Sequence, residues 1–217
     1  MKFTKLSLIA AVAVSAITTT AMAEVEISAN VAATNNYVWR GMTQSADKTA
    51  IQGGLDVGMD GFYAGTWISN VDFSSNATTE ADVYAGYANS LAGIDYDLGY
   101  INYTYLKEHG INFEEVYLGL SKDFGVASLG ATYSKGLSDA KDDIAVDASI
   151  GLVQDFSLDL GYGDYDTYGN RYSVGVSKTF GKIDYSLAYQ NFDADTGTNS
   201  AGVADERNIV VSAGTSF

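Results

Sequence analysis

The sequence predicts an all-β fold, a transmembrane antiparallel up-and-down β-barrel of about 12 strands with both termini in the periplasm. Segments of about nine to twelve residues alternate apolar with small or polar side chains, which matches the length that a tilted strand needs to span a bilayer. Short turns and longer polar loops alternate along the chain. The composition favours strands with flexible turns, because proline and cysteine are absent while 23 glycines and 16 tyrosines are present.

The first 23 residues have the features of a cleaved Sec signal peptide. Lys2 and Lys5 form a positive n-region, residues 6–14 form an apolar h-region, and residues 21–23 form a small-x-small cleavage site. The apolar run is shorter than the ~20 residues of a membrane-spanning helix. We therefore expect residues 24–217 to form a single barrel domain in the outer membrane of a Gram-negative bacterium.

Alternating side chains define the expected strands. The predicted ranges are 25–36, 49–58, 62–70, 80–90, 94–105, 113–122, 126–135, 144–153, 157–164, 171–180, 183–192 and 208–217. Counted along the chain, the odd-numbered connections between strands are long. The even-numbered connections are short and mostly contain Gly or Asp, as tight hairpins do. Periplasmic turns of bacterial barrels are short and outer loops are long, so both termini are expected in the periplasm. Two strands fewer or more remain an alternative, because the first loop could hold extra extended structure.

The final segment is expected to close the barrel by pairing with residues 25–36. Its lipid-facing side chains should be Ile209, Val211, Ala213, Thr215 and Phe217, because residues two apart share one face of a strand. Closure is required because an open strand edge in hydrocarbon leaves backbone groups unpaired. Phe217 is also the expected assembly signal for the barrel-assembly machinery.

Segment 94–105 contains a break in its alternation. Ile94, Tyr96, Leu98 and Tyr100 share one face, but from Ile101 onwards the apolar residues occupy odd positions. A β-bulge near residue 99 or 100 would absorb that shift.

Aromatic residues cluster near the ends of the predicted strands. They are expected to form interfacial girdles, where an amphipathic ring lies at the level of the lipid headgroups. This set comprises Tyr37, Trp39, Phe62, Phe113, Phe124, Phe156, Phe180 and Phe217.

The ionisable residues expected to face inward are mostly acidic. The candidate lumen-lining residues are Asp56, Asp82, Asp95, Asp97, Asp147, Asp159 and Asp184, with Arg40 and Arg171 as the basic ones. Carboxylates around a narrow aqueous lumen concentrate cations and exclude anions. The alternative is that basic residues pair with some of them in a plugged, structural interior. Arg40 continues the phase of the first strand and is expected either at the outer mouth of the lumen or as a loop arginine in water.

Enzymatic activity is not expected, and neither is a cofactor or a metal site. A serine–histidine mechanism would depend on His109, the one histidine, which lies in a short loop with no suggestively spaced serine. The segment from Asp193 begins like a calcium loop, but Gly197 and Ala204 stand where oxygen ligands should be. A net charge of −15 argues against a nucleic-acid partner.

Residues 36–45 and 51–56 resemble the opening signature of the TorF family of outer-membrane porins. The resemblance continues through residues 61–67, 69–73, 82–87 and 114–117, and Trp39 stands where a phenylalanine is expected. The resemblance implies a porin barrel without an established substrate or catalytic residues. It also implies that one family-typical unit at the first loop contains Arg40, Gln44, Gln52 and Asp56.

The combined prediction is a channel for passive diffusion of small hydrophilic solutes, with a preference for cations. The alternatives are a structural or adhesive barrel with a filled lumen and an outer-membrane enzyme that modifies lipids. Expected partners are outer-membrane lipids and lipopolysaccharide, the barrel-assembly machinery and the permeating solutes.

Overall fold

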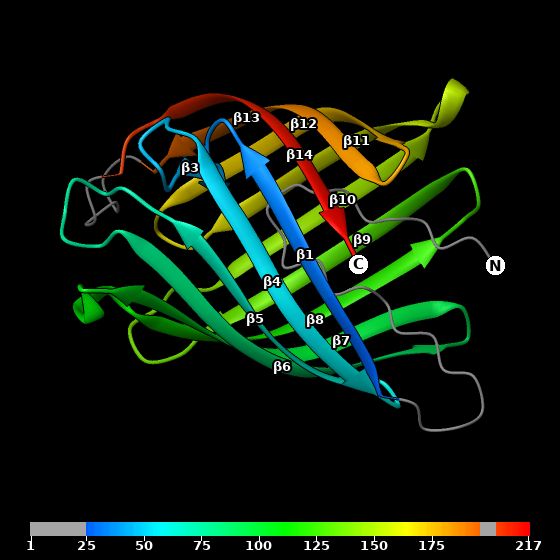
Figure 1. The fold of residues 1–217 in the computed structure, drawn as a ribbon, viewed down its shortest axis with the longest axis horizontal. Helices are drawn as coiled ribbons and strands as arrows, with labels where there is room; N and C mark the ends of the chain where they lie inside the picture. The colour runs from blue at the N-terminus through cyan, green and yellow to red at the C-terminus, as the bar shows by residue number, and fades with distance from the viewer. Residues whose placement is uncertain (1–24, 196–202) are drawn as a thin grey trace.

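A computed structural model describes residues 25–195 and 203–217, which form a closed antiparallel barrel (Figure 1). The predicted signal peptide and most of the calcium-like loop lie outside these residues. The wall strands are β1 (Glu26–Thr34), β4 (Ala50–Met59), β5 (Phe62–Asn70), β6 (Thr79–Leu91), β7 (Ile94–Leu106), β8 (Phe113–Asp123), β9 (Ala127–Gly136), β10 (Asp143–Gly151), β11 (Phe156–Tyr165), β12 (Gly169–Phe180), β13 (Ile183–Ala194) and β14 (Glu206–Ser216). Two short strands, β2 (Val38–Trp39) and β3 (Met42–Thr43), form a separate sheet. Single 3-10 turns occupy His109–Ile111 and Val153–Asp155, and no described helix is long and apolar enough to cross a membrane.

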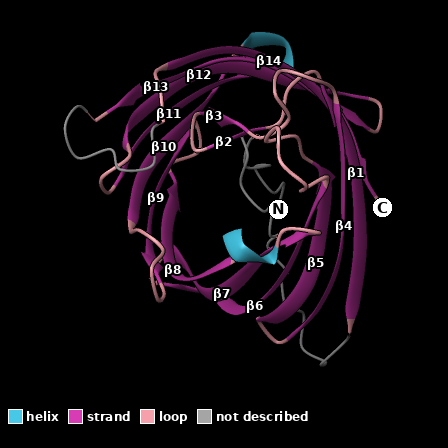
Figure 2. Ribbon diagram, turned by 90° about the vertical axis from the view of Figure 1, so that its left-hand side faces the viewer, coloured by secondary structure: helices cyan, strands magenta, loops and turns pink. Residues whose placement is uncertain are grey.

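The twelve wall strands pair with their neighbours in sequence, and β14 pairs with β1 to close the ring (Figure 2). The closing register runs from Asn30 opposite Ser216 to Thr34 opposite Ser212. Ala29 and Phe217 exchange backbone hydrogen bonds of 2.9 and 3.0 Å. The predicted strand number and the predicted closing pair are therefore confirmed, and the ring has no free strand edge.

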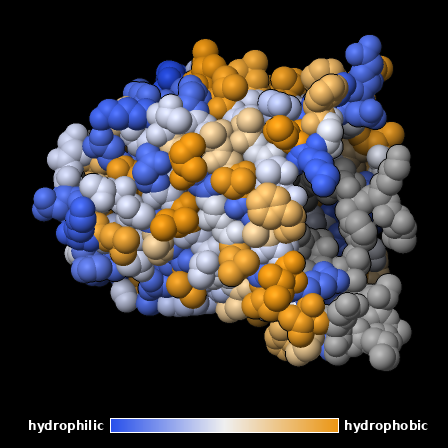
Figure 3. Space-filling model, viewed as in Figure 1, coloured by the Kyte–Doolittle hydropathy of each residue, from blue (hydrophilic) through white to orange (hydrophobic). Residues whose placement is uncertain are grey.

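The outer surface of the barrel wall is apolar. Along β14, Ile209 and Val211 are 65% and 51% exposed, whereas their inward neighbour Val210 is 8% exposed. Hydrophilic residues gather instead at the end of the molecule that carries the long loops (Figure 3). This distribution is typical of a barrel whose outside contacts lipid.

Exposed aromatic side chains form two outward bands. Near the short turns lie Phe62, Phe124, Phe156, Phe180 and Phe217, as predicted. Nearer the long loops lie Tyr100, Tyr133, Tyr162 and Tyr172. The other members of the predicted girdle face the interior, because Tyr37 is buried and both Trp39 and Phe113 pack against the same internal cluster. Two bands flanking an apolar wall are the expected markers of the two membrane interfaces.

The predicted β-bulge in β7 is wrong. The β6–β7 register runs without interruption from Thr79 opposite Leu106 to Leu91 opposite Ile94. The odd-numbered residues Ile101, Tyr103 and Tyr105 face inward and are 2–8% exposed. The alternation changes because the interior itself changes along β7, from aspartates near the short turns to a packed aromatic cluster near the long loops.

Tyrosine rings cover glycines on neighbouring strands along one side of the interior. A Cβ atom at Gly86 would overlap the hydroxyl group of Tyr63, and one at Gly99 would overlap the ring of Tyr117. The Tyr63 hydroxyl donates to Asp97 at 2.6 Å and lies 2.5 Å from the Tyr117 hydroxyl. These glycines are therefore required by the close approach of the rings.

Gly86→Ala is expected to lower the free energy of unfolding by about 1–3 kcal/mol, because the added methyl group displaces the Tyr63 ring. The shift would be measured by urea unfolding of the barrel in lipid vesicles. Gly119→Ala is the matched control, since its Cβ would lie 3.7 Å from the Thr132 hydroxyl in ordinary contact. Equal stabilities of the two variants would contradict the close-packing argument.

Candidate functional site in the barrel lumen

The first long loop folds back into the barrel as a hairpin. Val38 pairs with Thr43 and Trp39 with Met42, and the Gln44 N–H donates to the Tyr37 carbonyl at 2.7 Å. The turn residues Arg40 and Gly41 have φ values of 50° and 85°, the pattern of a type I′ turn. Figure 2 shows β2 and β3 inside the ring of wall strands. Extra extended structure therefore exists in the first loop, but it does not join the wall.

The tip of this hairpin lies against the inner face of β12 and β13. A Cβ atom at Gly41 would approach the Cβ atoms of Phe192 and Arg171 to 3.0 and 3.1 Å. Both this crowding and the positive φ require glycine at the turn.

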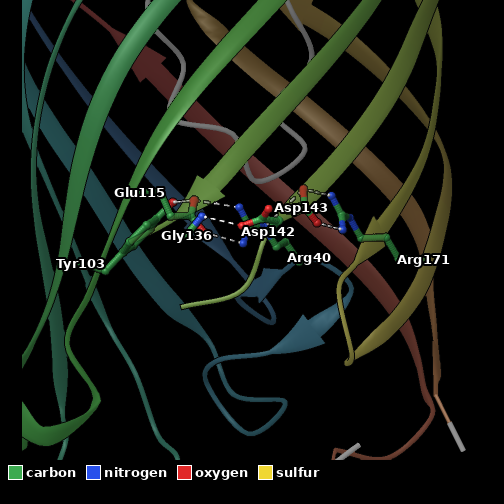
Figure 4. A network of polar contacts seen from close by, with 7 residues as sticks. All are labelled: Arg40, Tyr103, Glu115, Gly136, Asp142, Asp143 and Arg171. Carbon is green, nitrogen blue, oxygen red and sulfur yellow. Dashed lines mark hydrogen bonds and ion pairs between the residues drawn. The ribbon is translucent and has the colours of Figure 1, made fainter. Parts of the chain in front are cut away.

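Arg40 lies at the centre of a buried ionic network (Figure 4). Its Nη1 and Nη2 atoms donate to the two carboxylate oxygens of Glu115 at 2.7 and 2.8 Å. Its Nε atom lies 3.5 Å from Asp143, which also forms a two-point ion pair with Arg171. The side chains of Arg40, Glu115 and Asp143 are 8%, 1% and 5% exposed. Two arginines and two acids leave the network formally neutral, which is how buried charges are usually tolerated.

The environment holds Arg40 in its charged form. Burial alone would lower the pKa of the guanidinium, but attraction by Glu115 and Asp143 outweighs it and raises the pKa above its usual range. Planar two-point pairing to carboxylates is the geometry that favours arginine over lysine.

Aromatic rings hold the same hairpin from both sides. The Arg40 guanidinium lies 4.2 Å from the Trp39 ring centroid and 4.7 Å from that of Tyr165. The Trp39 ring meets Tyr103 at 5.8 Å and Tyr165 at 5.6 Å between centroids, both edge-to-face. Trp39 thus contacts two internal clusters. One lies on the β5–β8 side and includes Tyr103, and the other comprises Met42, Tyr165 and Phe192. The loop end of the lumen is packed across part of its width.

Polar contacts fix the base of the hairpin to the closing strand. Asn36 donates to Asn208 at 3.1 Å and accepts from Thr43 at 2.7 Å. The Thr43 N–H donates to Glu206 at 2.7 Å. The hairpin is therefore attached at its base as well as at its tip.

The candidate aspartates occupy inward positions with few charged neighbours. Asp56 accepts from Tyr84, Asp97 from Tyr63, Asp184 from Thr179, and Asp159 from Ser149 and Ser177. Asp95 and Asp147 are exposed, whereas Asp82 is 2% exposed. Within residues 25–195 and 203–217, no ion pair to Lys or Arg is formed by Asp56, Asp82, Asp95, Asp97, Asp147 or Asp159.

Both candidate arginines pair with acids that the sequence analysis did not name. Arg40 and Arg171 bind Glu115 and Asp143. Arg40 reaches the interior through the hairpin turn rather than by continuing β1, which ends at Thr34, and it is not a loop arginine in water. A sequence signal for Glu115 existed, because the alternation within residues 113–122 places it on the inward face with Tyr117. Asp143 lies directly before the predicted strand 144–153.

The residues that the resemblance grouped at the first loop divide between two elements. Arg40 and Gln44 belong to the hairpin region, where Gln44 donates to the Met42 carbonyl at 3.0 Å. Gln52 and Asp56 belong to β4 in the wall, and Asp56 bonds to Tyr84 on β6.

His109 is exposed in its 3-10 turn, and within the described residues it forms no hydrogen bond with a serine. Its neighbour Glu108 accepts from the N–H groups of Asn76 and Ala77, and hydrogen bonds from Ser75 and these amides lower the pKa of that carboxyl group. The part of the chain that the structure describes also contains no group of three or more His, Cys, Asp or Glu that could hold a metal ion. The lack of enzymatic activity stays a prediction.

Comparisons with solved structures support the barrel fold. The KdgM porin in complex with disordered oligogalacturonate matches with a TM-score of 0.61 and 9% identity, over 88% of this chain and 97% of that one. The NanC porin matches with a TM-score of 0.57 and 12% identity, over 87% of this chain and 98% of that one. At such identities the likeness establishes the fold alone.

A search of curated proteins finds no match to this sequence. A family model described as "Bacterial protein of unknown function (Gcw_chp)" matches residues 18–217, which include every wall strand and the internal hairpin. The chain therefore belongs to the Gcw_chp family of bacterial proteins.

Proposed function

We propose that the protein is an outer-membrane channel for passive diffusion of small hydrophilic solutes and that it favours cations. The observation that carries this proposal is the set of inward aspartates without basic partners. Because the Arg40 and Arg171 network is internally neutral, it does not offset their charge. A net negative lumen attracts cations and repels anions.

The side chains near the short turns are suited to an aqueous passage. Exposed Asp95 and Asp147 lie on the same inward row as Ser121 and Gly130, as the strand registers place these residues opposite one another. Small residues leave room, and carboxylates hold water and cations. The inserted hairpin would then form the narrow part of the passage at the loop end.

Several other features support the outer-membrane location. The export signal expected in residues 1–23, the apolar outer wall and the porin-like fold all agree with it. The resemblance of residues 36–45 to TorF porins supports the channel and also a place in that narrower family. Lipopolysaccharide as a surface partner, and recognition of the exposed Phe217 by the assembly machinery, belong to the same proposal.

Planar-bilayer recordings test the channel proposal directly. The protein is expected to give discrete conductance steps, and its reversal potential across a KCl gradient should have the sign for K⁺ selectivity. Simultaneous D95N, D97N and D147N substitutions should move the reversal potential toward zero, because they remove three lumen charges.

The matched control is the triple variant D60N, D155N and D164N, which removes three charges from exposed turn or outward positions. It should keep the selectivity of the unchanged protein. Currents that do not exceed those of the empty bilayer would refute the channel, and anion selectivity would refute the cation preference.

One observation favours the alternative of a structural or adhesive barrel. Trp39 and Arg40 join packed side chains on opposite sides of the lumen, as a filled interior would require. Under this alternative the bilayer recordings would show no conductance although the barrel is folded and inserted.

A further inference from the structure

Two acidic side chains are buried one above the other on the inner face of β6. Glu80 is 1% exposed and Asp82 is 2% exposed, although Asp82 was expected to line an aqueous lumen. They lie opposite Tyr105 and Tyr103 in the β6–β7 register, beside the aromatic cluster that includes Tyr37. Neither forms an ion pair with any described Lys, Arg or His.

Each of these carboxylates has an oxygen atom without a partner. Glu80 Oε2 and Asp82 Oδ1 are fully buried and accept no hydrogen bond. The other oxygen of Glu80 accepts a long hydrogen bond of 3.4 Å from the Tyr105 hydroxyl group. Buried polar atoms are nearly always paired, so two orphan oxygens in one place indicate a missing positive or donor partner.

Tyr37 brings the inserted hairpin to this pair. Its side chain contacts Glu80, and burial together with the negative charges of Glu80 and Asp82 raises the pKa of Tyr37 well above its usual value. The Tyr37 and Tyr105 side chains therefore meet Glu80, and Asp82 lies two residues further along the same inward face of β6. Carboxylate oxygens are ligands that hard cations prefer.

Protonation of each carboxyl group would also remove its charge, but it would still leave the buried Glu80 Oε2 and Asp82 Oδ1 atoms without partners. A calcium-sized ion bound at about 2.3–2.6 Å from carboxylate oxygens supplies both a partner for these atoms and two charges that balance the two carboxylates.

We propose that Glu80 and Asp82, with the Tyr37 and Tyr105 hydroxyl oxygens, bind a divalent oxygen-preferring cation such as Ca²⁺. The bound ion joins β6 in the wall to Tyr37 at the start of the hairpin. Cation binding thus stabilises the inserted position of the hairpin, because it favours the folded arrangement that creates the site. Cation binding at this site does not depend on solute passage through the lumen.

Terbium luminescence tests the site, since Tb³⁺ replaces Ca²⁺ and is sensitised by nearby tyrosine and tryptophan. The full-length protein isolated from membranes is expected to give Tb³⁺ emission that Ca²⁺ displaces. The E80Q and D82N double variant should reduce the emission to the level of buffer. These substitutions keep the side-chain shapes and remove buried charge, and retained heat-modifiable migration on a gel would show that the barrel is folded.

The matched control is the D60N and D155N double variant, which neutralises two exposed acids in turns outside the lumen and should keep the emission. A second measurement compares thermal unfolding in Ca²⁺ and in EDTA: the midpoint should be higher in Ca²⁺ for the unchanged protein and equal in both for E80Q and D82N. Emission that survives in E80Q and D82N, or a midpoint that Ca²⁺ does not change, would overturn the proposal. A midpoint that responds to pH but not to Ca²⁺ would show that protons neutralise the pair instead.

Discussion

Arg40→Met is expected to destabilise the barrel by about 3–5 kcal/mol and to raise its single-channel conductance. The substitution leaves Glu115 charged at 1% exposure without its two-point partner, whereas Asp143 still pairs with Arg171. It also removes the cation over the Trp39 and Tyr165 rings. The hairpin loses its central attachment and should leave the lumen more often. Urea unfolding in lipid vesicles would measure the stability, and planar bilayers the conductance.

Two further variants test whether the destabilisation comes from loss of the buried ionic network or from loss of any positively charged side chain in the loop. Combining R40M with E115Q should recover part of the stability, because no buried charge is then left unpaired. Lys48→Met breaks the exposed pair with Asp72, whose side chains are 69% and 37% exposed, and should cost no more than about 1 kcal/mol. If R40M proved as stable as K48M, the network would not anchor the hairpin.

The wall of the barrel could be predicted from the sequence because its signals are local. A strand with one face toward lipid and one toward the interior alternates with a period of two, and tight turns need Gly or Asp. Residues 62–70 were predicted to the residue, and the closing pair followed from the need to leave no strand edge in hydrocarbon. Both kinds of signal depend only on neighbours along the chain and on the membrane.

The interior hairpin could not be predicted in the same way. Its strands contain two residues each, too few for any alternation, and residues 37–48 have the polar composition of an outer loop. Its main contact joins Arg40 to Glu115 across 75 positions of sequence. The sequence signal for this arrangement was the change of alternation at Ile101. It marks the point where the barrel interior becomes apolar and does not mark a bulge.

The candidate site was predicted in part for a related reason. Alternation places Asp95 and Asp97 on the face of β7 opposite to that of Tyr96, but it does not indicate which inward side chains meet one another. Those contacts depend on strand tilt and on the stagger between strands. Arg171 therefore pairs with Asp143, two strands away on β10, and Arg40 pairs with Glu115 on β8, two contacts that alternation alone does not predict.

Trp39→Ala is expected to have the next largest effect, a loss of about 3 kcal/mol with a rise in conductance. Trp39 is the side chain that contacts both internal clusters, through Tyr103 and Phe113 on one side and Tyr165 on the other. Its removal leaves a cavity between them and exposes the Arg40 pair to water, which weakens the ionic network as well. The two effects are coupled, because the Arg40 guanidinium lies 4.2 Å from the Trp39 ring centroid.

Trp39→Phe is the matched variant, because it keeps an aromatic ring at this position. It should cost less than about 1.5 kcal/mol and leave the conductance near that of the unchanged protein. Alanine should therefore lower the stability and raise the conductance more than phenylalanine does. If alanine lowered stability without raising conductance, Trp39 would support the barrel but the hairpin would not narrow the passage. If phenylalanine were as damaging as alanine, the contacts of the indole ring rather than the filling of the gap would hold the hairpin in place.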